Sequence, residues 1–484
     1  MSGDVQLFSE CLRDIMQARQ WSVESLAAMT GYKSRTSITR ILREQSGHQN
    51  RVRFFDLLRK SKMLTPEEEE RLKKALNVSL CGKDRTNAQQ IFARLVSGKM
   101  DTGSFEMAGI QRLLNMLNEG EAFHILLINC VYVPLFDLLR EMLAQRAACS
   151  VRHYFILEES ETDVAQTLYC LSRTAYLPNY NAFICNHDAA DEYMPPRINL
   201  FSARVEKADG PAMDVLAVFS NSGWIKIHQI PSVDGLHSFV ERIFDQQMTS
   251  CQPITRSCDI SSGPASFLDT MRCYEAYERD NDTYNIKAGF CANAIPTHIL
   301  RATLDLHKLS RIFSDVGAGE LKKMLDAVLY YQHLRYRDTF EGKKRRNNIF
   351  STGMLKRFAQ TGLIAEHFIA MRPFSVQERI AILENLLMQA CNNKFFFLYF
   401  FKDGFEPAYE VNCFDGVGIG AFPINWENAY TNNFCYHIIY NDRLTENFKD
   451  YFLNYFKAYH TIPVNEGLEL MRSLIAELKS MDAI

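Results

Sequence analysis

The chain has 484 residues, of which 47% are hydrophobic and 23% are charged. This is the composition of a globular protein, and at about 150 residues per domain it predicts roughly three domains. It excludes a largely disordered chain, a collagen and a small disulfide-rich protein. No run of about 18 uncharged apolar residues occurs, and the N-terminus has no apolar signal core, so we expect neither a membrane span nor a signal peptide. Thirteen cysteines without a CxxC pair favour reduced thiols and a cytoplasmic location.

Positive charge is concentrated near the N-terminus, although the whole chain has a net charge of -3. Residues 1–100 contain 18 Lys and Arg against 11 Asp and Glu, and residues 33–60 contain eight against two. A basic segment on an otherwise acidic chain is typical of a nucleic-acid-binding module. A solvated basic helix face would produce the same charge pattern.

The first eighty residues show the spacing and caps of short helices. Apolar residues recur at helical spacing over 5–19, which predicts a first helix. Ser22 is placed to cap a second helix that ends at Gly31, and Ser34 is placed to cap a third that extends to about Glu44. The third helix has an inner apolar face of Ile38, Ile41 and Leu42, and an outer face of Thr36, Thr39, Arg40 and Arg43. A helix with such an outer face suits the major groove of DNA.

The run SVESLAAMTGYKSRTSITRIL, from Ser22 to Leu42, resembles the helix-turn-helix of the Cro/Xre-type transcriptional regulators. The positions that match the family pattern are Ser22, Leu26, Ala27, Gly31, Ser34, Ile38, Thr39, Arg40 and Ile41. The chain has one residue more than the pattern between Gly31 and Ile38, so we expect an enlarged turn over 31–34. Ser25 stands where a Glu or Gln would complete a capping box. Helices around 54–58 and from Pro66, capped by Thr65, to about Val78 would complete a five-helix bundle.

The resemblance implies a DNA-binding domain that works as a homodimer on double-stranded DNA, because a single module of this size buries little surface. Residues expected to read or approach bases are Arg35, Thr36, Thr39 and Arg40. Residues expected at the phosphates are Lys33, Arg43, Arg51 and Arg53, and Ser34 belongs to the same interface as the helix cap.

The rest of the chain predicts a mixed α/β region. We place a helix-turn-helix domain at 1–80, a linker or helix at 81–102, an α/β lobe at 103–252, a mainly helical segment at 253–374 and a second α/β lobe at 375–484. Residues 81–85 are expected to form a hinge, and 87–96 a linker or dimer helix. Strands are predicted at 123–131, 151–157, 181–185, 198–205, 215–219, 224–229, 395–401, 408–414 and 436–440.

The fold class is therefore multidomain, with an all-α bundle followed by a mixed α/β region. The two α/β parts share an outline, since the helix and strand at 110–123 resemble those at 380–395. One interpretation is a pair of related sensor lobes around the helical segment, and the other is a chance similarity between ordinary α/β units.

Motifs for catalysis or cofactor binding are weak. The run Gly416–Gly420 lacks a following helix that could hold a phosphate, and the Gly317–Gly319 run has no strand leading into it. Cys185 with His187, and Cys435 with His437, do not repeat at zinc spacing. The run Lys343–Arg346 is expected to be a solvated loop rather than a second phosphate contact. We therefore expect no cofactor, no metal and no enzymatic activity.

These observations predict a sequence-specific transcriptional regulator with a C-terminal region that senses a small-molecule or peptide effector or assembles the protein. Two alternatives stay open. One is a protein-interaction module, such as an antitoxin-like or phage-related assembly factor. The other is an enzyme with a DNA-binding head, which would need a cluster of ionisable groups in a C-terminal pocket.

Overall fold

The computed structural model describes residues 7–31, 35–43, 45–46, 48–97, 107–131, 133–146, 148–157, 160–175, 177, 179–186, 199–219, 225–231, 235–247, 251–259, 264–287, 292–305, 307, 310, 316–364, 371–405, 407–423 and 435–482. The chain forms two compact units, Met1–Gln90 with Ser160–Thr162, and Ile91–Glu159 with Asp163–Ile484.

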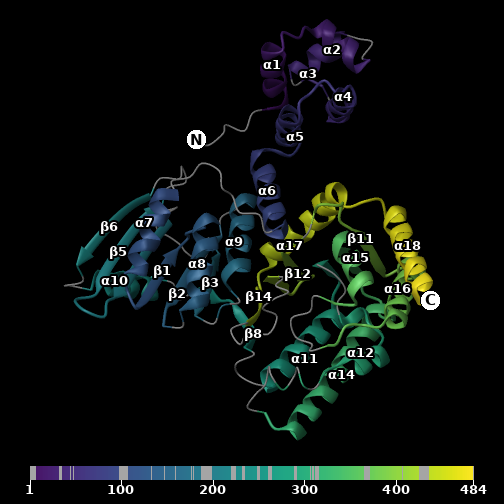
Figure 1. Ribbon diagram of the computed structural model, residues 1–484. Coiled ribbons are helices and arrows are strands. Elements are labelled where there is room, and N and C mark those ends of the chain that lie inside the picture. The colour runs from purple at the N-terminus through teal and green to yellow at the C-terminus, as the bar shows by residue number, and fades with distance from the viewer. Residues whose placement is uncertain are drawn as a thin grey trace. The chain divides into compact units, whose positions relative to one another are not determined.

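The described part of the first unit is mainly helical (Figure 1). Its helices are α1 (Phe8–Ala18), α2 (Val23–Thr30), α3 (Arg35–Leu42), α4 (His48–Lys60), α5 (Pro66–Cys81) and the first part of α6 (Lys83–Ser97). They share one apolar core in which Phe8, Leu26, Ile38 and Phe54 have no exposed surface. The helices expected in this stretch are therefore present, with ends displaced by a few residues.

Local hydrogen bonds begin two of these helices. The Ser22 amide donates to Ser25 Oγ over 2.6 Å, and the Ser25 amide donates to Ser22 Oγ over 3.1 Å. The Ser25 hydroxyl thus accepts the hydrogen bond that a Glu or Gln side chain accepts in the usual capping box, so the box is complete without an acid. Thr65, which was predicted as the cap of α5, makes the same reciprocal pair with Glu68.

The predicted hinge at 81–85 is shorter than expected. Helix α5 continues through Cys81, α6 begins at Lys83, and only Gly82 separates them, with φ +85° and ψ 162°. Residues 83–86 are helical rather than loop, because the Gly82 carbonyl oxygen accepts hydrogen bonds from the Thr86 amide and hydroxyl.

The second unit contains a seven-stranded sheet in the order β6-β5-β4-β1-β2-β3-β7. Strands β1, β2 and β3 run parallel, and the remaining neighbours pair antiparallel. Helix α8 covers one face, where Phe136 stacks on His153, and α10 covers the other, where Phe244 packs near Leu126. The strands are β1 (Ala122–Ile128), β2 (Ser150–Leu157), β3 (Tyr180–Asn186), β4 (Asn199–Glu206), β5 (Met213–Phe219), β6 (Ile225–Pro231) and β7 (Gln252–Pro253). The helices are α7 (Met107–Asn118), α8 (Val133–Gln145), α9 (Glu161–Thr174) and α10 (Leu236–Gln247).

A five-stranded sheet follows, in the order β11-β10-β9-β12-β13. Its strands are β9 (Thr283–Lys287), β10 (Arg346–Phe350), β11 (Phe396–Phe400), β12 (Tyr409–Phe414) and β13 (Gly418–Pro423), and a two-stranded sheet joins β8 (Thr255–Asp259) to β14 (Cys435–Ile438). The accompanying helices are α11 (Pro264–Asp280), η3 (Ala292–Ala294), α12 (Thr297–Thr303), α14 (Ala318–Phe340), α15 (Thr352–Thr361), α16 (Val376–Asn392), α17 (Asp442–Tyr451), the π-helix η4 (Phe452–His460) and α18 (Val464–Asp482).

The two large sheets repeat one topology. In both, three parallel strands (β1-β2-β3 and β9-β10-β11) are followed by two antiparallel strands (β4-β5 and β12-β13) added beside the first. We call residues 107–247 the first lobe and 264–482 the second lobe. The similarity considered from the sequence used the wrong pairing, because α7 and β1 correspond in order to α11 and β9 rather than to α16 and β11. Strands β9 and β10 lie inside the stretch that was expected to be mainly helical.

Among the residues that the structure describes, no helix is long and apolar enough to cross a membrane. The expectation of reduced thiols throughout is wrong at Cys251, which is disulfide-bonded. Seven further described cysteines are not disulfide-bonded: Cys11, Cys130, Cys149, Cys170, Cys273, Cys391 and Cys413.

Candidate nucleic-acid interface

Helix α3 separates an apolar inner face from a polar outer one. Ile38 is fully buried and Ile41 is 1% exposed, both against the core of the first unit. Residues three and four positions apart lie on the same side of a helix, so Arg35 and Thr39 share one stripe and Thr36 and Arg40 the next. The outer face carries four of the predicted contact residues on one rigid element.

The side chains of α3 differ in how freely they can reach a ligand. Arg35, Thr36 and Arg40 are exposed, and Thr39 is half-buried. The Thr39 hydroxyl donates to the Arg35 carbonyl oxygen over 3.1 Å, which leaves its oxygen able to accept a further hydrogen bond.

Arg35 is held by a residue that sequence reasoning did not single out. Its Nη1 lies 3.1 Å from Oε1 of Glu24 on α2, and both side chains are largely exposed, at 72% and 53%. Hydrogen bonds from its own backbone amide and from Ser22, followed by the charge of Arg35, lower the pKa of Glu24. The pair could be found only with the fold in hand, because no spacing rule links residues 24 and 35.

The predicted phosphate contacts come from several places. Arg43 is exposed just after α3, and Arg53 is exposed on α4. Arg51 is half-buried, because it lies on the same stripe of α4 as the buried Phe55. Lys33 and Ser34, with the predicted enlarged turn, lie outside the described residues.

The basic run between α14 and β10 is only partly a solvated loop. Lys343, Lys344 and Arg345 are exposed in a turn, but Arg346 begins β10 and is 3% exposed. Its guanidinium donates to the backbone oxygens of Asn281 and Glu278. Arg346 therefore has a structural role, and the loop prediction is wrong at this residue.

The glycine run at 416–420 belongs to a β-hairpin. Gly416 has φ +71°, and Gly418 begins β13. A Cβ atom at Gly418 would lie 2.6 Å from the Ile439 carbonyl oxygen, so close strand packing explains the glycine. Gly317 precedes α14 as its N-cap. The side chains of Cys185, His187 and Cys435 lie outside the described residues, and within the described part no group of His, Cys, Asp and Glu could hold a metal ion.

The first lobe brings a serine, a histidine and an aspartate together. Ser202 Oγ lies 3.0 Å from His237 Nδ1, and Asp214 Oδ2 accepts from the backbone amide of His237 over 3.1 Å. In a hydrolase triad the aspartate would bind the imidazole instead. All three side chains are at most 3% exposed, and burial lowers the pKa of His237. The cluster supports the start of α10.

The second lobe contains a layer of buried charges that the sequence did not reveal. Arg335 makes a bidentate ion pair with Glu278 at 2.8 and 2.9 Å, and Lys287 Nζ lies 3.3 Å from Glu410 Oε2. Burial alone would raise the pKa of Glu278, but Arg335, Arg346 and Lys287 together lower it. None of these five residues is more than 9% exposed. Because both glutamates are paired with a cation and all five residues are buried, the group is typical of a structural network.

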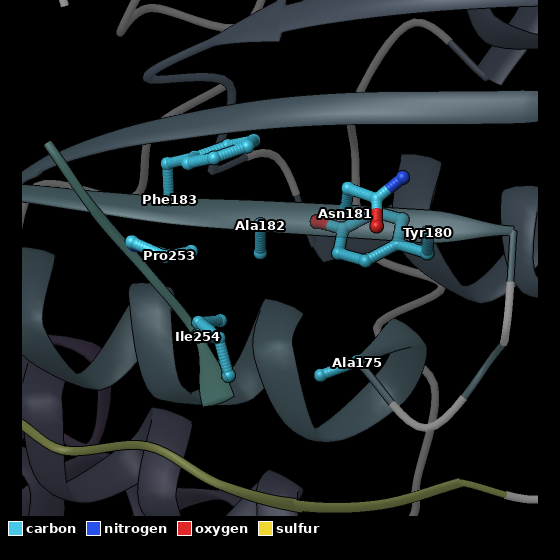
Figure 2. Close-up of a pocket in the computed structure, with 7 residues that line it drawn as sticks. All are labelled: Ala175, Tyr180, Asn181, Ala182, Phe183, Pro253 and Ile254. Carbon is cyan, nitrogen blue, oxygen red and sulfur yellow. The ribbon is translucent and has the colours of Figure 1, made fainter. Parts of the chain in front are cut away.

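A small pocket lies between β3 of the first lobe and β7, which follows that lobe in the chain (Figure 2). Both polar and apolar surface line it, and the lining residues are Ala175, Tyr180, Asn181, Ala182, Phe183, Pro253 and Ile254. The Tyr180 hydroxyl is already paired with His153 Nδ1 at 2.6 Å. None of the predicted site residues lies in this pocket.

No protein-family model matches the sequence, and comparisons with curated proteins and with solved structures find no match.

Proposed function

We propose that this protein is a sequence-specific DNA-binding transcriptional regulator of the Cro/Xre type, acting in the cytoplasm. The observation that carries the proposal is the division of α3: Ile38 and Ile41 anchor it in the core while Arg35, Thr36 and Arg40 face outward. Arginine and hydroxyl side chains on an exposed helix are the groups that bind base edges and phosphates in the major groove.

The arrangement of α2 and α3 supports the same proposal. Helix α2 ends at Thr30 and is capped by Gly31, whose φ of +66° is the left-handed conformation that favours glycine, and α3 starts four residues after Gly31. Under the proposal α3 is the recognition helix and α2 supports it. Because such a module buries little DNA surface, the regulator would bind as a homodimer on two half-sites.

The second unit would sense a small-molecule or peptide effector or assemble the protein. No catalytic role is proposed for it. The enzyme alternative required a cluster of ionisable groups in a pocket, and the charged layer of the second lobe is instead buried and internally paired.

A fluorescence anisotropy titration of the full-length protein tests the proposal. It compares the upstream region of the protein's own gene with scrambled DNA at several salt concentrations. Arg40→Ala should reduce sequence discrimination by roughly 5- to 150-fold, which corresponds to about 1–3 kcal/mol for a base contact. Lys322→Ala/Lys323→Ala is the matched control, because it removes exposed charge from α14 in the second unit.

Equal, weak binding to both DNAs would contradict the proposal and favour the protein-interaction alternative. Selective binding that Arg40→Ala leaves intact would show that the recognition face has been assigned wrongly.

A further inference from the structure

We infer that the second unit regulates DNA binding by the first through α6. We call α6 the strut, and we call the hydrogen bonds that Asp84 makes with residues 160–162 the clamp. The inference rests on the proposed function and adds how the site is controlled. It is carried by hydrogen bonds at Asp84, an aromatic contact at Phe92 and the backbone conformation of Gly82.

Asp84 ties the first turn of α6 to the start of α9. Its carboxylate accepts from Ser160 Oγ over 2.7 Å, from the Glu161 amide over 2.7 Å and from the Thr162 amide over 3.2 Å. The Thr162 hydroxyl donates back to the Asp84 carbonyl oxygen over 3.0 Å. The first amides of a helix have no partner within it, so Asp84 caps α9 from another helix.

This clamp holds a charged carboxylate. Burial works against ionisation, but the hydrogen bonds from Thr162, Ser160 and the Glu161 amide lower the pKa of Asp84. The positive end of the α9 dipole also favours the charge. At neutral pH the acceptor is therefore fully ionised.

The second part of α6 is anchored in the second unit. Phe92 is fully buried, and its ring centroid lies 4.2 Å from that of Tyr451 and 6.1 Å from that of Phe448. Tyr451 and Phe448 belong to α17, in the second lobe. Ala88 and Leu95 on α6 are also fully buried. The second part of α6 is therefore packed in the second unit and is not a free linker.

Gly82 is the one residue between this strut and α5. Its φ of +85° with ψ of 162° is accessible to glycine but not to side-chain-bearing residues without strain. No atom lies within 4 Å of where a Cβ would be, so a substitution acts through the backbone alone. A change in the lobes that moves α6 would therefore reach the DNA-binding helices through Gly82.

The test uses full-length protein with Asp84→Ala and Gly82→Ala, and with Asp326→Ala and Gly317→Ala as controls in exposed positions of the second unit. Hydrogen–deuterium exchange reports on the clamp, and the anisotropy titration reports on DNA binding. We expect Asp84→Ala to speed exchange at Glu161 and Thr162 at least tenfold while α1–α4 exchange as in the wild type. We expect both variants, but not the controls, to change operator affinity at least fivefold.

Unchanged exchange at 161–162 in Asp84→Ala would overturn the clamp. Wild-type operator affinity in both variants would overturn the coupling, provided that the wild-type protein binds selectively. A wild-type protein that binds operator and scrambled DNA equally would instead refute the proposed function, and the regulatory inference with it. The exchange data would still show whether Asp84 holds the start of α9.

Discussion

Under the proposed function, Glu24 is the residue whose substitution best separates DNA affinity from sequence selectivity at α3. Its carboxylate lies 3.1 Å from the Arg35 guanidinium and repels any DNA phosphate that approaches. Glu24→Gln should raise affinity for scrambled DNA more than for the operator, so that the ratio of the two affinities falls about threefold to tenfold. Anisotropy at several salt concentrations measures this, with Glu70→Gln on α5 as the control. An unchanged ratio would mean that Glu24 does not position Arg35.

A second residue-scale prediction concerns Tyr409 in the second unit. Its hydroxyl accepts from Arg140 over 3.1 Å and from Arg173 over 2.5 Å, and the Arg173 guanidinium lies over the Tyr409 ring at 4.4 Å. Arg173 is 3% exposed, so removing an acceptor should be costly. Tyr409→Phe should lower the free energy of unfolding by about 1–3 kcal/mol, measured by urea denaturation. Tyr459→Phe, at an exposed tyrosine, should have no effect, and equal effects of both would contradict this role.

At the scale of helices and strands, the sequence predicted elements whose buried side chains are apolar. Strand β2 was predicted, and its Val151 and Phe155 are buried. Strand β10, Arg346–Phe350, was missed because it buries Arg346, Asn347 and Asn348, and an isolated sequence does not show that other elements supply their partners. Exposure of Arg35, Thr36 and Arg40 on α3 followed from helical spacing, whereas the Glu24 contact depends on how α2 and α3 pack.

The start of α16 provides an element-scale prediction with a defined pH dependence. Glu378 accepts a hydrogen bond from the Ser375 amide and makes a bidentate ion pair with Arg372. The hydrogen bond from Arg372 is the largest of the effects that lower the pKa of Glu378 to about 2, against the opposing effect of burial. Because the pKa of Glu378 is lower in the folded than in the unfolded protein, its charge stabilises the fold at pH values above the unfolded-state pKa. This stabilisation is lost as the pH falls towards 2. Glu378→Gln should cost about 1 kcal/mol at pH 7 and progressively less between pH 4.5 and about 2.

Urea denaturation of both proteins across this pH range measures the difference. Glu384→Gln, at an exposed position of the same helix, is the control. A difference that is constant with pH would show that the Glu378 charge contributes nothing to the helix start.

At the scale of the molecule, the repeated topology explains why the sequence comparison paired the wrong elements. A helix that packs on a buried parallel strand has an apolar stripe, and the strand itself is an apolar run. The sequence of α7–β1 therefore resembles that of α16–β11, although the two pairs do not hold corresponding places in their sheets. The strand order settles the correspondence. By this correspondence, α8 follows β1 and α14 follows β9 in the chain. The sheet faces near these helices differ in chemistry. His153 and Phe155 lie near α8, whereas Arg346 and Asn348 lie on the face near α11 and α14. The two lobes therefore share an order of elements and differ in core polarity.

Separate cores predict separate unfolding of the two units. The core around Phe8, Leu26 and Phe54 contains only residues of the first unit, so it can be weakened without touching the sheets. Ile38→Ala removes a fully buried side chain and should cost about 2–5 kcal/mol. Scanning calorimetry should show two transitions, of which Ile38→Ala lowers one and Ile286→Ala, in β9, lowers the other. A single transition that both variants shift equally would mean that the units unfold as one body, and α6 would then transmit stability as well as position.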